Sequence, residues 1–304
     1  MSFSYEVKKE LIEIQNEACC MFAQSYGFLL FGRSFSVSGL SLLSDYAEVA
    51  NAYAGAAEYI SGFHPEVTCS QAGKYSVSIP SGRTSRAILS EFGYDGSEYR
   101  LRLNSANIRN DCCLQAFIRG AFLACGSITD PEKDYHLEFS IASKTLADHF
   151  IKLFDAYDSL EAGQDVSIHP KMIVRGGAYI VYVKDSSSVE DLLLVMGAQN
   201  AAMELMQTKI YKDIKNNVNR KVNFETANLG RSVDASRVQV RAIQKLKDEG
   251  LLVTFPEDIR ALAELRLQEQ EMSLRELGDS MDPPMSRSAV NYRIKKLLDA
   301  AKNL

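Results

Sequence analysis

The chain has 304 residues, of which 46% are hydrophobic and 24% are charged. These values are typical of soluble globular proteins of about two domains. The longest apolar runs stop well short of the ~18 residues that a membrane span needs, and the charged, amphipathic N-terminus does not resemble a signal peptide. The net charge of −5 is unevenly distributed: residues 1–200 hold 16 Lys and Arg against 24 Asp and Glu, and residues 201–304 hold 18 against 15. We therefore expect the back third to bind any polyanion.

The six cysteines give no sign of a metal site. No two stand in C-x-x-C spacing, and the four histidines are scattered. The sequence therefore predicts no metal and no cofactor. Adjacent cysteines in apolar, helix-like stretches are typical of buried thiols in a reducing cytoplasm, and a redox role is the less favoured alternative. The cysteines are Cys19, Cys20, Cys69, Cys112, Cys113 and Cys125.

The front two hundred residues contain an internal duplication. Residues 19–30 recur as residues 112–123, with a Cys-Cys pair and a glycine at the same offset of 93 positions. A His-Pro pair then precedes a Gly-containing hairpin segment in both halves, at His64 and at His169. A third matching pair, residues 88–93 and 192–197, follows in the same order. We expect two halves of similar fold, at about 1–95 and 105–200.

Each half predicts the order α-β-β-α-β-β-α, so the fold class is α+β. The first helices are expected at 17–31 and 110–125 and the first strands at 34–38 and 135–141. The second helices are expected at 45–61 and 143–157. Hairpins then turn at 71–73 and 175–177, where glycine supplies positive φ. The closing helices are expected at 84–92 and 188–196.

A glycine stands in the middle of the first helix of each half, at Gly27 and Gly120. In isolation such a glycine costs roughly 1 kcal/mol relative to alanine. The cost is offset if two helices approach closely there, and we expect this contact on a pseudo-two-fold axis. The alternative is a tolerated glycine without a partner.

The helix formed by residues 117–128, opening such a unit, resembles that of the LAGLIDADG homing endonucleases. In that family two such helices pack on the axis, and each ends in an acid that binds catalytic Mg²⁺, an ion that requires hard oxygen ligands. When Gly120 is aligned with the motif glycine, the acid positions fall on Cys125 and Leu123, and on Gly32 and Leu30 in the first half. Because none is a carboxylate, we predict no catalytic residues and no enzyme.

The front half also lacks the excess of basic residues that a DNA-binding sheet normally needs. Two local basic stretches occur, and we interpret them as solvated surface rather than a weak DNA patch. They are Arg100, Arg102 and Arg109, and Lys171 and Arg175. A role in protein binding or as a scaffold is therefore favoured for this half.

A linker is expected at 201–225, as a helix running into a basic segment rich in asparagine. Those amides could contact phosphates and base edges or cap turns, and the sequence leaves both open. A helix at 233–248 follows, with Ala235, Val238, Ala242 and Leu246 expected on its buried face. The basic residues expected to contact the DNA backbone are Lys215, Arg220, Lys221, Arg231, Arg237, Arg241 and Lys245.

The domain at 226–304 ends in a predicted helix-turn-helix. A first helix starts at Pro256, and Ser273 to Glu276 form a capping box that starts the second. Residues 282–284, Asp-Pro-Pro, force a break, after which Ser286 caps the last helix. The residues expected to position the helices are Ser273, Arg275, Glu276 and Ser286.

The last helix, 286–299, is expected to enter the major groove, where Arg and Asn can bind guanine and adenine bidentately. Five basic residues stand against one acidic residue from 286 to 304. A small helical module that only binds protein is the alternative. The predicted recognition residues are Arg287, Ser288, Asn291, Tyr292, Arg293, Lys295 and Lys296.

The combination of residues 119–123, 130–138 and 273–293 closely resembles the WhiA family, and the resemblance covers essentially the whole chain. It implies a DNA-binding transcription regulator of sporulation or cell division in Gram-positive bacteria, cytoplasmic and nucleoid-associated, without enzymatic activity. Implied partners are promoter DNA, RNA polymerase or a sigma factor, or a second regulator such as a WhiB-type iron–sulphur protein in actinobacteria. The rival hypotheses are a non-enzymatic cell-division scaffold and an active homing endonuclease.

Overall fold

The structure is a computed structural model that describes residues 2–98, 100–160 and 168–302. It divides into two compact units, Met1–Lys212 and Asp213–Leu304, with the boundary inside the stretch expected to be a linker. In these described ranges, no helix combines the length and the apolar character needed to cross a bilayer. Each unit has its own hydrophobic core.

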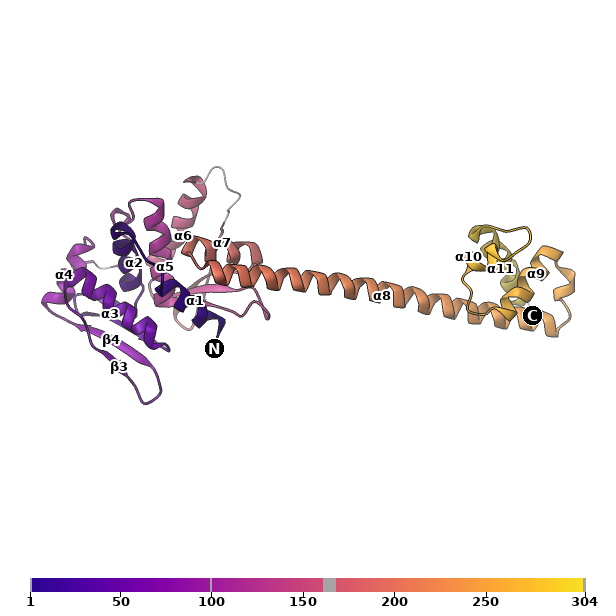
Figure 1. The fold of residues 1–304 in the computed structure, drawn as a ribbon, viewed down its shortest axis with the longest axis horizontal. Helices are drawn as coiled ribbons and strands as arrows, with labels where there is room; N and C mark the ends of the chain where they lie inside the picture. The colour runs from indigo at the N-terminus through magenta and orange to yellow at the C-terminus, as the bar shows by residue number, and fades with distance from the viewer. Residues whose placement is uncertain (1, 99, 161–167, 303–304) are drawn as a thin grey trace. The chain divides into compact units, whose positions relative to one another are not determined.

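The first unit contains the same series of elements twice (Figure 1). The first copy runs through α2 (Ala18–Leu30), β1 (Ser34–Ser36), β2 (Gly39–Ser44), α3 (Ala47–Ser61), β3 (Val67–Cys69), β4 (Tyr75–Pro80) and α4 (Arg83–Glu91). A 3-10 turn, η1 (Ser105–Asn107), precedes the second copy. That copy runs through α5 (Asp111–Cys125), β5 (Gly126–Ile128), β6 (Leu137–Ile141), α6 (Lys144–Leu160), β7 (Lys171–Arg175), β8 (Ala178–Val183) and α7 (Ser186–Met196).

The two sheets have the same antiparallel topology, with strand orders β1-β2-β4-β3 and β5-β6-β8-β7. Their central pairs bury matching residues: Leu42 faces Val77 in one sheet, and Phe139 faces Val181 in the other. Alternation of buried and exposed positions places one face of each sheet on the core. The predicted duplication and the α+β class are therefore confirmed.

Helices α2 and α5 pack against each other through their glycines. A Cβ on Gly27 would lie 2.3 Å from the carbonyl oxygen of Phe117. One on Gly120 would lie 2.2 Å from the carbonyl oxygen of Gln24 and 2.8 Å from the amide nitrogen of Phe28. Only a residue without a side chain allows the two backbones this separation.

An N-terminal helix, α1 (Phe3–Ile12), stands outside the duplicated series and was not predicted. Val7 and Leu11 are fully buried in the core of the first unit. The Glu10 carboxylate accepts hydrogen bonds from the backbone amides of Asn200 (2.7 Å) and Ala201 (3.1 Å). Because these are unpaired donors at the start of the next helix, α1 caps that helix.

That helix, α8 (Gln199–Asp248), is 50 residues long and belongs partly to each unit. The sequence predicted a linker to 225 and a separate helix from 233, and the structure corrects this to one continuous helix. The asparagine-rich segment lies within it, so these amides do not cap turns. From 213 to 235, every side chain that the structure describes is exposed.

The second unit folds the end of α8 together with four short elements (Figure 1). These are η2 (Leu252–Thr254), α9 (Glu257–Gln268), α10 (Leu274–Asp279) and α11 (Arg287–Lys302). Their core contains Ile243, Leu262, Leu277 and Ile294. Pro256 stands one residue before α9 rather than at its first position.

Candidate nucleic-acid interface

Local hydrogen bonds fix the starts of α10 and α11, the two helices of the helix-turn-helix. The Ser273 amide donates to Glu276 Oε2 (2.7 Å), and the Glu276 amide donates to Ser273 Oγ (3.3 Å), which confirms the predicted capping box. The bond from Ser273 holds the pKa of Glu276 below its usual value. After the break, the Ala289 amide donates to Ser286 Oγ (3.3 Å), so Ser286 caps α11 as predicted.

Close packing at Gly278 sets the distance between the two helices. The Met285 amide donates to the Gly278 carbonyl (2.9 Å), and a Cβ on Gly278 would lie 2.2 Å from the Met285 carbonyl oxygen. Any larger residue would push the turn away from α10. This glycine was not singled out from the sequence, although a Gly near a helix end before an Asp-Pro-Pro break was a usable signal.

Helix α11 buries Val290, Ile294 and Leu297 against α9 and α10, as its apolar spacing predicted. Arg293 was predicted to read bases, but its Nε donates to Asp258 Oδ2 on α9 (2.7 Å) and its Nη1 to its own helix. This bond keeps the pKa of Asp258 below its usual value. The structure therefore uses Arg293 to hold α11 on α9.

The opposite side of α11 is exposed, and we name it the α11 face. The ammonium of Lys296 lies 4.8 Å from the centre of the Tyr292 ring, and the Tyr292 side chain is 60% exposed. The cation–π contact orders two of the exposed side chains beside each other. The α11 face consists of Arg287, Ser288, Asn291, Tyr292, Lys295 and Lys296.

A hollow of about 620 Å³ lies between α8 and the start of the helix-turn-helix. Four arginines from four helices line it: Arg231, Arg266, Arg275 and Arg287. Arg275 was predicted to position the helices, but its side chain is 83% exposed and its Nε lies 4.0 Å from Asp279 of its own helix. It contributes positive charge to the hollow rather than a contact that fixes the fold.

The floor of this hollow was not predicted from the sequence. Arg266, near the end of α9, is 2% exposed and donates from Nη1 to the carbonyl of Met272 (2.6 Å) in the following loop. Burial lowers the pKa of the Arg266 guanidinium. Ser236 of α8 donates to the Gln270 carbonyl (2.5 Å). The Arg266 bond holds the loop before α10 on α9, and the Ser236 bond fastens α8, with the basic residues that it carries, to the same loop.

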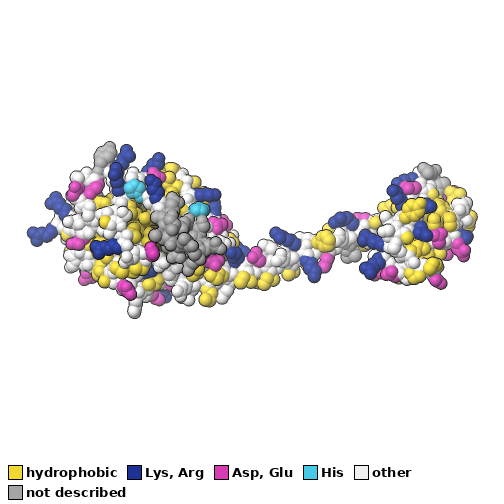
Figure 2. Space-filling view, turned by 90° about the horizontal axis from the view of Figure 1, so that it is seen from above, with side chains coloured by type: hydrophobic (Ala, Val, Ile, Leu, Met, Phe, Trp, Pro, Cys, Tyr) yellow, Lys and Arg dark blue, Asp and Glu magenta, His cyan; other side chains and the backbone are white. Residues whose placement is uncertain are grey.

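The buried face of α8 in this unit differs from the prediction. Ser236, Gln239, Ile243 and Leu246 are buried, whereas Val238 is 57% exposed and Ala235 is exposed. Ser236 is inward because its hydroxyl donates to the Gln270 carbonyl. The basic stripe Arg237, Arg241 and Lys245 is exposed, as are Lys215, Arg220, Lys221 and Arg231. Lys and Arg side chains are visible along the later part of α8 and on the adjoining edge of the second unit in Figure 2.

Two lysines near the start of the basic segment are used inside the first unit. Lys209 Nζ lies 3.9 Å from Glu190 Oε2. Lys212 donates to the Pro131 carbonyl (2.7 Å) and lies over the Tyr135 ring at 4.7 Å. In the same unit, Arg175 is paired with Glu138 at 2.5 Å, which offsets its charge. Arg100, Arg102, Arg109 and Lys171 are exposed.

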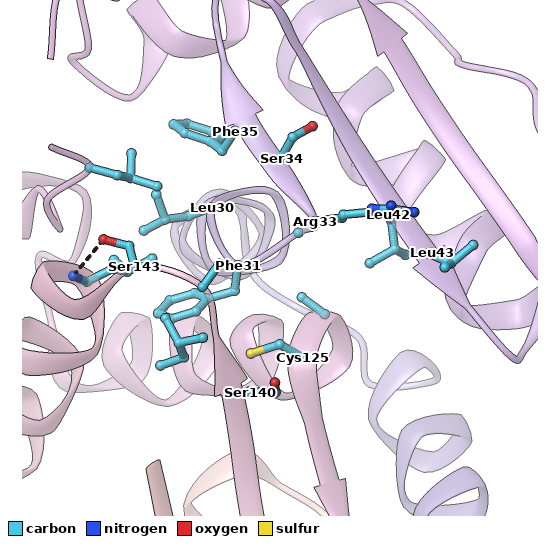
Figure 3. A pocket seen from close by; sticks show the side chains of 16 residues that line it. Leu30, Phe31, Arg33, Ser34, Phe35, Leu42, Leu43, Cys125, Ser140 and Ser143 are labelled. Carbon is cyan, nitrogen blue, oxygen red and sulfur yellow. Dashed lines mark hydrogen bonds between the residues drawn. The ribbon is translucent and has the colours of Figure 1, made fainter. Parts of the chain in front are cut away.

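A second hollow, of about 410 Å³, lies at the C-terminal ends of α2 and α5 (Figure 3). The resemblance to homing endonucleases implied metal-binding acids at these helix ends. Gly32 and Cys125 line the hollow, and no carboxylate occurs among the described residues of its lining. Burial raises the pKa of the Cys125 thiol to about 12, so this thiol stays protonated. The side chains do not fit Mg²⁺, which takes oxygen ligands.

A buried lysine places a positive charge beside this hollow. Lys8 of α1 is 8% exposed and donates from Nζ to the Leu123 carbonyl (3.1 Å) near the end of α5. Its ammonium also lies 5.7 Å from the centre of the Phe122 ring. A carbonyl at a helix C-terminus attracts a cation, and here the protein supplies that cation itself.

The two units together define a class of proteins in which a duplicated LAGLIDADG-like fold is joined to a helix-turn-helix domain. The profile of the WhiA LAGLIDADG-like domain matches residues 114–215, and that of the WhiA C-terminal HTH domain matches residues 218–301. A protein named "Probable cell division protein WhiA" from Ruminiclostridium cellulolyticum is 34% identical over 100% of this chain and 98% of its own length. A protein of the same name from Alkaliphilus metalliredigens is 32% identical over 98% and 96%. The chain therefore belongs to the WhiA family.

A solved structure shows the same fold. Full-length WhiA from Thermotoga maritima matches 100% of this chain and 99% of its own, with a TM-score of 0.60 at 23% identity. The predicted resemblance to this family is thus confirmed.

Proposed function

We propose that the chain is a sequence-specific, double-stranded DNA-binding transcription regulator without enzymatic activity. The observation that carries this proposal is the α11 face, six exposed polar residues on the last helix of a helix-turn-helix. Arg287 and Asn291, four residues apart, lie on one side of the helix and have the side chains that bind guanine and adenine edges. The exposed stripe Arg237, Arg241 and Lys245 would neutralise phosphates on either strand.

The cellular role that we propose is regulation of sporulation or of cell division and chromosome segregation, at promoters in the nucleoid of the cytoplasm. The names of the curated relatives support the cell-division part. The acidic front half, with 24 acidic against 16 basic residues in 1–200, suits a protein partner better than DNA. RNA polymerase with its sigma factor is the partner that we propose, or a second regulator of WhiB type in actinobacteria.

The absence of cleavage has its own test. With a neutral Cys125 and a buried Lys8 at the end of α5, and no carboxylate among the described residues that line the second hollow, we expect supercoiled plasmid to stay intact when the full chain is incubated with Mg²⁺ or Mn²⁺. Metal-dependent nicking that copurifies with the chain and disappears on a change in the second hollow would refute this part of the proposal.

Base readout is tested by selection from random duplex DNA. The full chain should enrich one motif. Arg287→Ala and Asn291→Ala should each weaken binding to that motif by about 5- to 150-fold, from the loss of roughly 1–3 kcal/mol of base contact. Lys302→Ala is the matched control, because it removes one positive charge from the exposed C-terminal end of α11.

Two results would favour the rival scaffold role. One is that no motif is enriched at low ionic strength. The other is that Arg287→Ala, Asn291→Ala and Lys302→Ala all bind the selected duplex as the unaltered chain does.

A further inference from the structure

Two pairs of adjacent cysteines, one from each copy of the duplicated fold, meet in the first unit. The Sγ atoms of Cys19, Cys20, Cys112 and Cys113 all lie within 4.8 Å of one another, and those of Cys19 and Cys20 are 3.8 Å apart. The sequence predicted no metal site because spacing along the chain is the usual signal. The pairs are 93 positions apart and are brought together because α2 packs on α5.

We propose that these four thiols form a tetrahedral site for one soft divalent cation, Zn²⁺ by its ligand chemistry. Zinc–sulfur bonds of about 2.3 Å place the sulfurs of a tetrahedral Cys₄ site about 3.8 Å apart. Sulfurs that already lie within 4.8 Å need only small rotations to reach this geometry. An iron–sulphur cluster contains several metal ions and spreads its cysteine sulfurs further apart, so a single ion fits better.

The backbone around the cluster suits four thiolates. Cys19 and Cys20 occupy the second and third positions of α2, and Cys112 and Cys113 occupy the same positions of α5. The N-cap residues of both helices, Glu17 and Asn110, make no side-chain capping hydrogen bond. The positive ends of two helix dipoles thus lie at the cluster, where four thiolates and one Zn²⁺ would sum to a charge of −2.

The cluster is accessible from solvent. Cys112 is exposed, Cys19 and Cys20 are half-buried, and Cys113 is buried. An ion can therefore enter without unfolding the unit. As each S–Zn bond forms, the S–H bond breaks and its proton goes to solvent, up to four protons per ion.

The site would connect the two copies at the ends of α2 and α5 opposite to the hollow that contains Cys125. A four-ligand site without an open position is structural rather than catalytic. Because Zn²⁺ binds the folded unit, it should raise the thermal unfolding midpoint of the reduced chain by about 5–10 °C at saturating metal.

The test uses the full chain, reduced, freed of metal and kept anaerobic, with Zn²⁺ or Co²⁺ as the probe. We expect about one Zn²⁺ per chain and, with Co²⁺, the intense thiolate charge-transfer and visible bands of a tetrahedral CoS₄ centre. Zn²⁺ should also slow alkylation of Cys19, Cys20, Cys112 and Cys113 at least ten-fold, measured residue by residue by mass spectrometry. Cys69, exposed and outside the cluster, should react equally fast in both conditions.

Variants complete the test. Cys20→Ser and Cys112→Ser should each abolish the CoS₄ spectrum and weaken Zn²⁺ binding by at least 100-fold, whereas Cys69→Ser should bind as the unaltered chain does. The proposal would be overturned if the four cysteines were alkylated at the same rate with and without Zn²⁺. It would also be overturned if the double variant with Cys20→Ser and Cys112→Ser bound as much Zn²⁺ as the unaltered chain. Alkylation is measured on the unaltered chain, so the test does not depend on how the variants fold.

Discussion

At Gly120 and Gly27 two helix backbones touch, and the duplicated fold depends on that contact. The positions are equivalent in the two copies, and each would drive a Cβ into a carbonyl oxygen of the facing helix. The packing of α2 on α5 in turn places the cysteine pairs at one end and the second hollow at the other.

Gly120→Ala should therefore destabilise the first unit by about 1–3 kcal/mol, because the facing backbone must move to admit a methyl group. Gly55→Ala is the control within α3, where a Cβ would meet no atom within 4 Å. We expect it to be neutral or to stabilise by about 0.5–1 kcal/mol. Urea unfolding of both variants measures the difference, and equal stabilities would show that the close contact is absent.

The burial of Lys8 changes the pKa of its side chain. Burial lowers the pKa of its ammonium to about 8, against about 10.4 in an unfolded chain. Between these values the unfolded state binds more protons than the folded state. The contribution of Lys8 to the free energy of unfolding therefore rises with pH across this window.

Lys8→Met removes that pH dependence. The free energy of unfolding of the variant minus that of the unaltered chain should fall by about 2 kcal/mol from pH 7 to pH 9.5. Taking the difference between the two proteins cancels the cysteines and tyrosines that titrate nearby. Lys9→Met, at an exposed position of the same helix, should follow the unaltered chain. A pH-independent difference for Lys8→Met would contradict the assignment.

Among the elements, α8 differs most from expectation. From 213 to 235 each described side chain is exposed, so this stretch has no tertiary packing from the chain itself to support its helix. It also contains Gly230 and several asparagines, residues that favour helix weakly. Beyond it, Ile243 and Leu246 are packed in the core of the second unit.

We expect amides at 214–232 to exchange with solvent at least ten-fold faster than those at 239–247, since a helix without packing opens locally. Gly230→Ala should slow exchange in the exposed stretch and leave α9 unchanged. Hydrogen-exchange mass spectrometry of the full chain measures both. Uniform protection along α8 would mean that something else stabilises the exposed stretch.

The elements show what the sequence could predict. Hydrophobic periodicity, turn glycines and the repeat located the paired helices and hairpins, and the capping box at Ser273 located the start of α10. The buried face of α8 was predicted wrongly because the prediction followed the spacing of apolar residues. Ser236 is polar and is buried because its hydroxyl bonds the Gln270 carbonyl. Arg293 was predicted to contact DNA because the sequence does not distinguish a basic residue that contacts DNA from one that pairs with an acid of a neighbouring helix, here Asp258.

Over the whole molecule, a chain of net charge −5 is proposed to bind a polyanion. An acidic chain can do so only if its basic residues are clustered at the DNA-binding surface, as they are in the stripe on α8 and on the α11 face. Each phosphate contact releases condensed counterions, so affinity must fall as salt rises.

Replacing Arg237, Arg241 and Lys245 together by alanine should reduce the slope of log K against log salt concentration by about 2–3, at roughly 0.9 per lost contact. The preferred DNA motif should stay the same, because these residues lie outside the α11 face. Fluorescence anisotropy on one duplex over a salt series gives the slope. An unchanged slope would remove α8 from the phosphate interface.

The buried ammonium of Lys8 would oppose metal binding at the end of α5 even if a carboxylate were introduced there. An aspartate introduced at Cys125 would meet a protonated amine from α1 before any ion from solution, and the two would neutralise each other as an internal salt bridge. Such a variant should gain an ion pair and no hydrolytic activity. Metal binding at this helix end would therefore require at least two coordinated changes, one of them in α1, which lies outside the duplicated series.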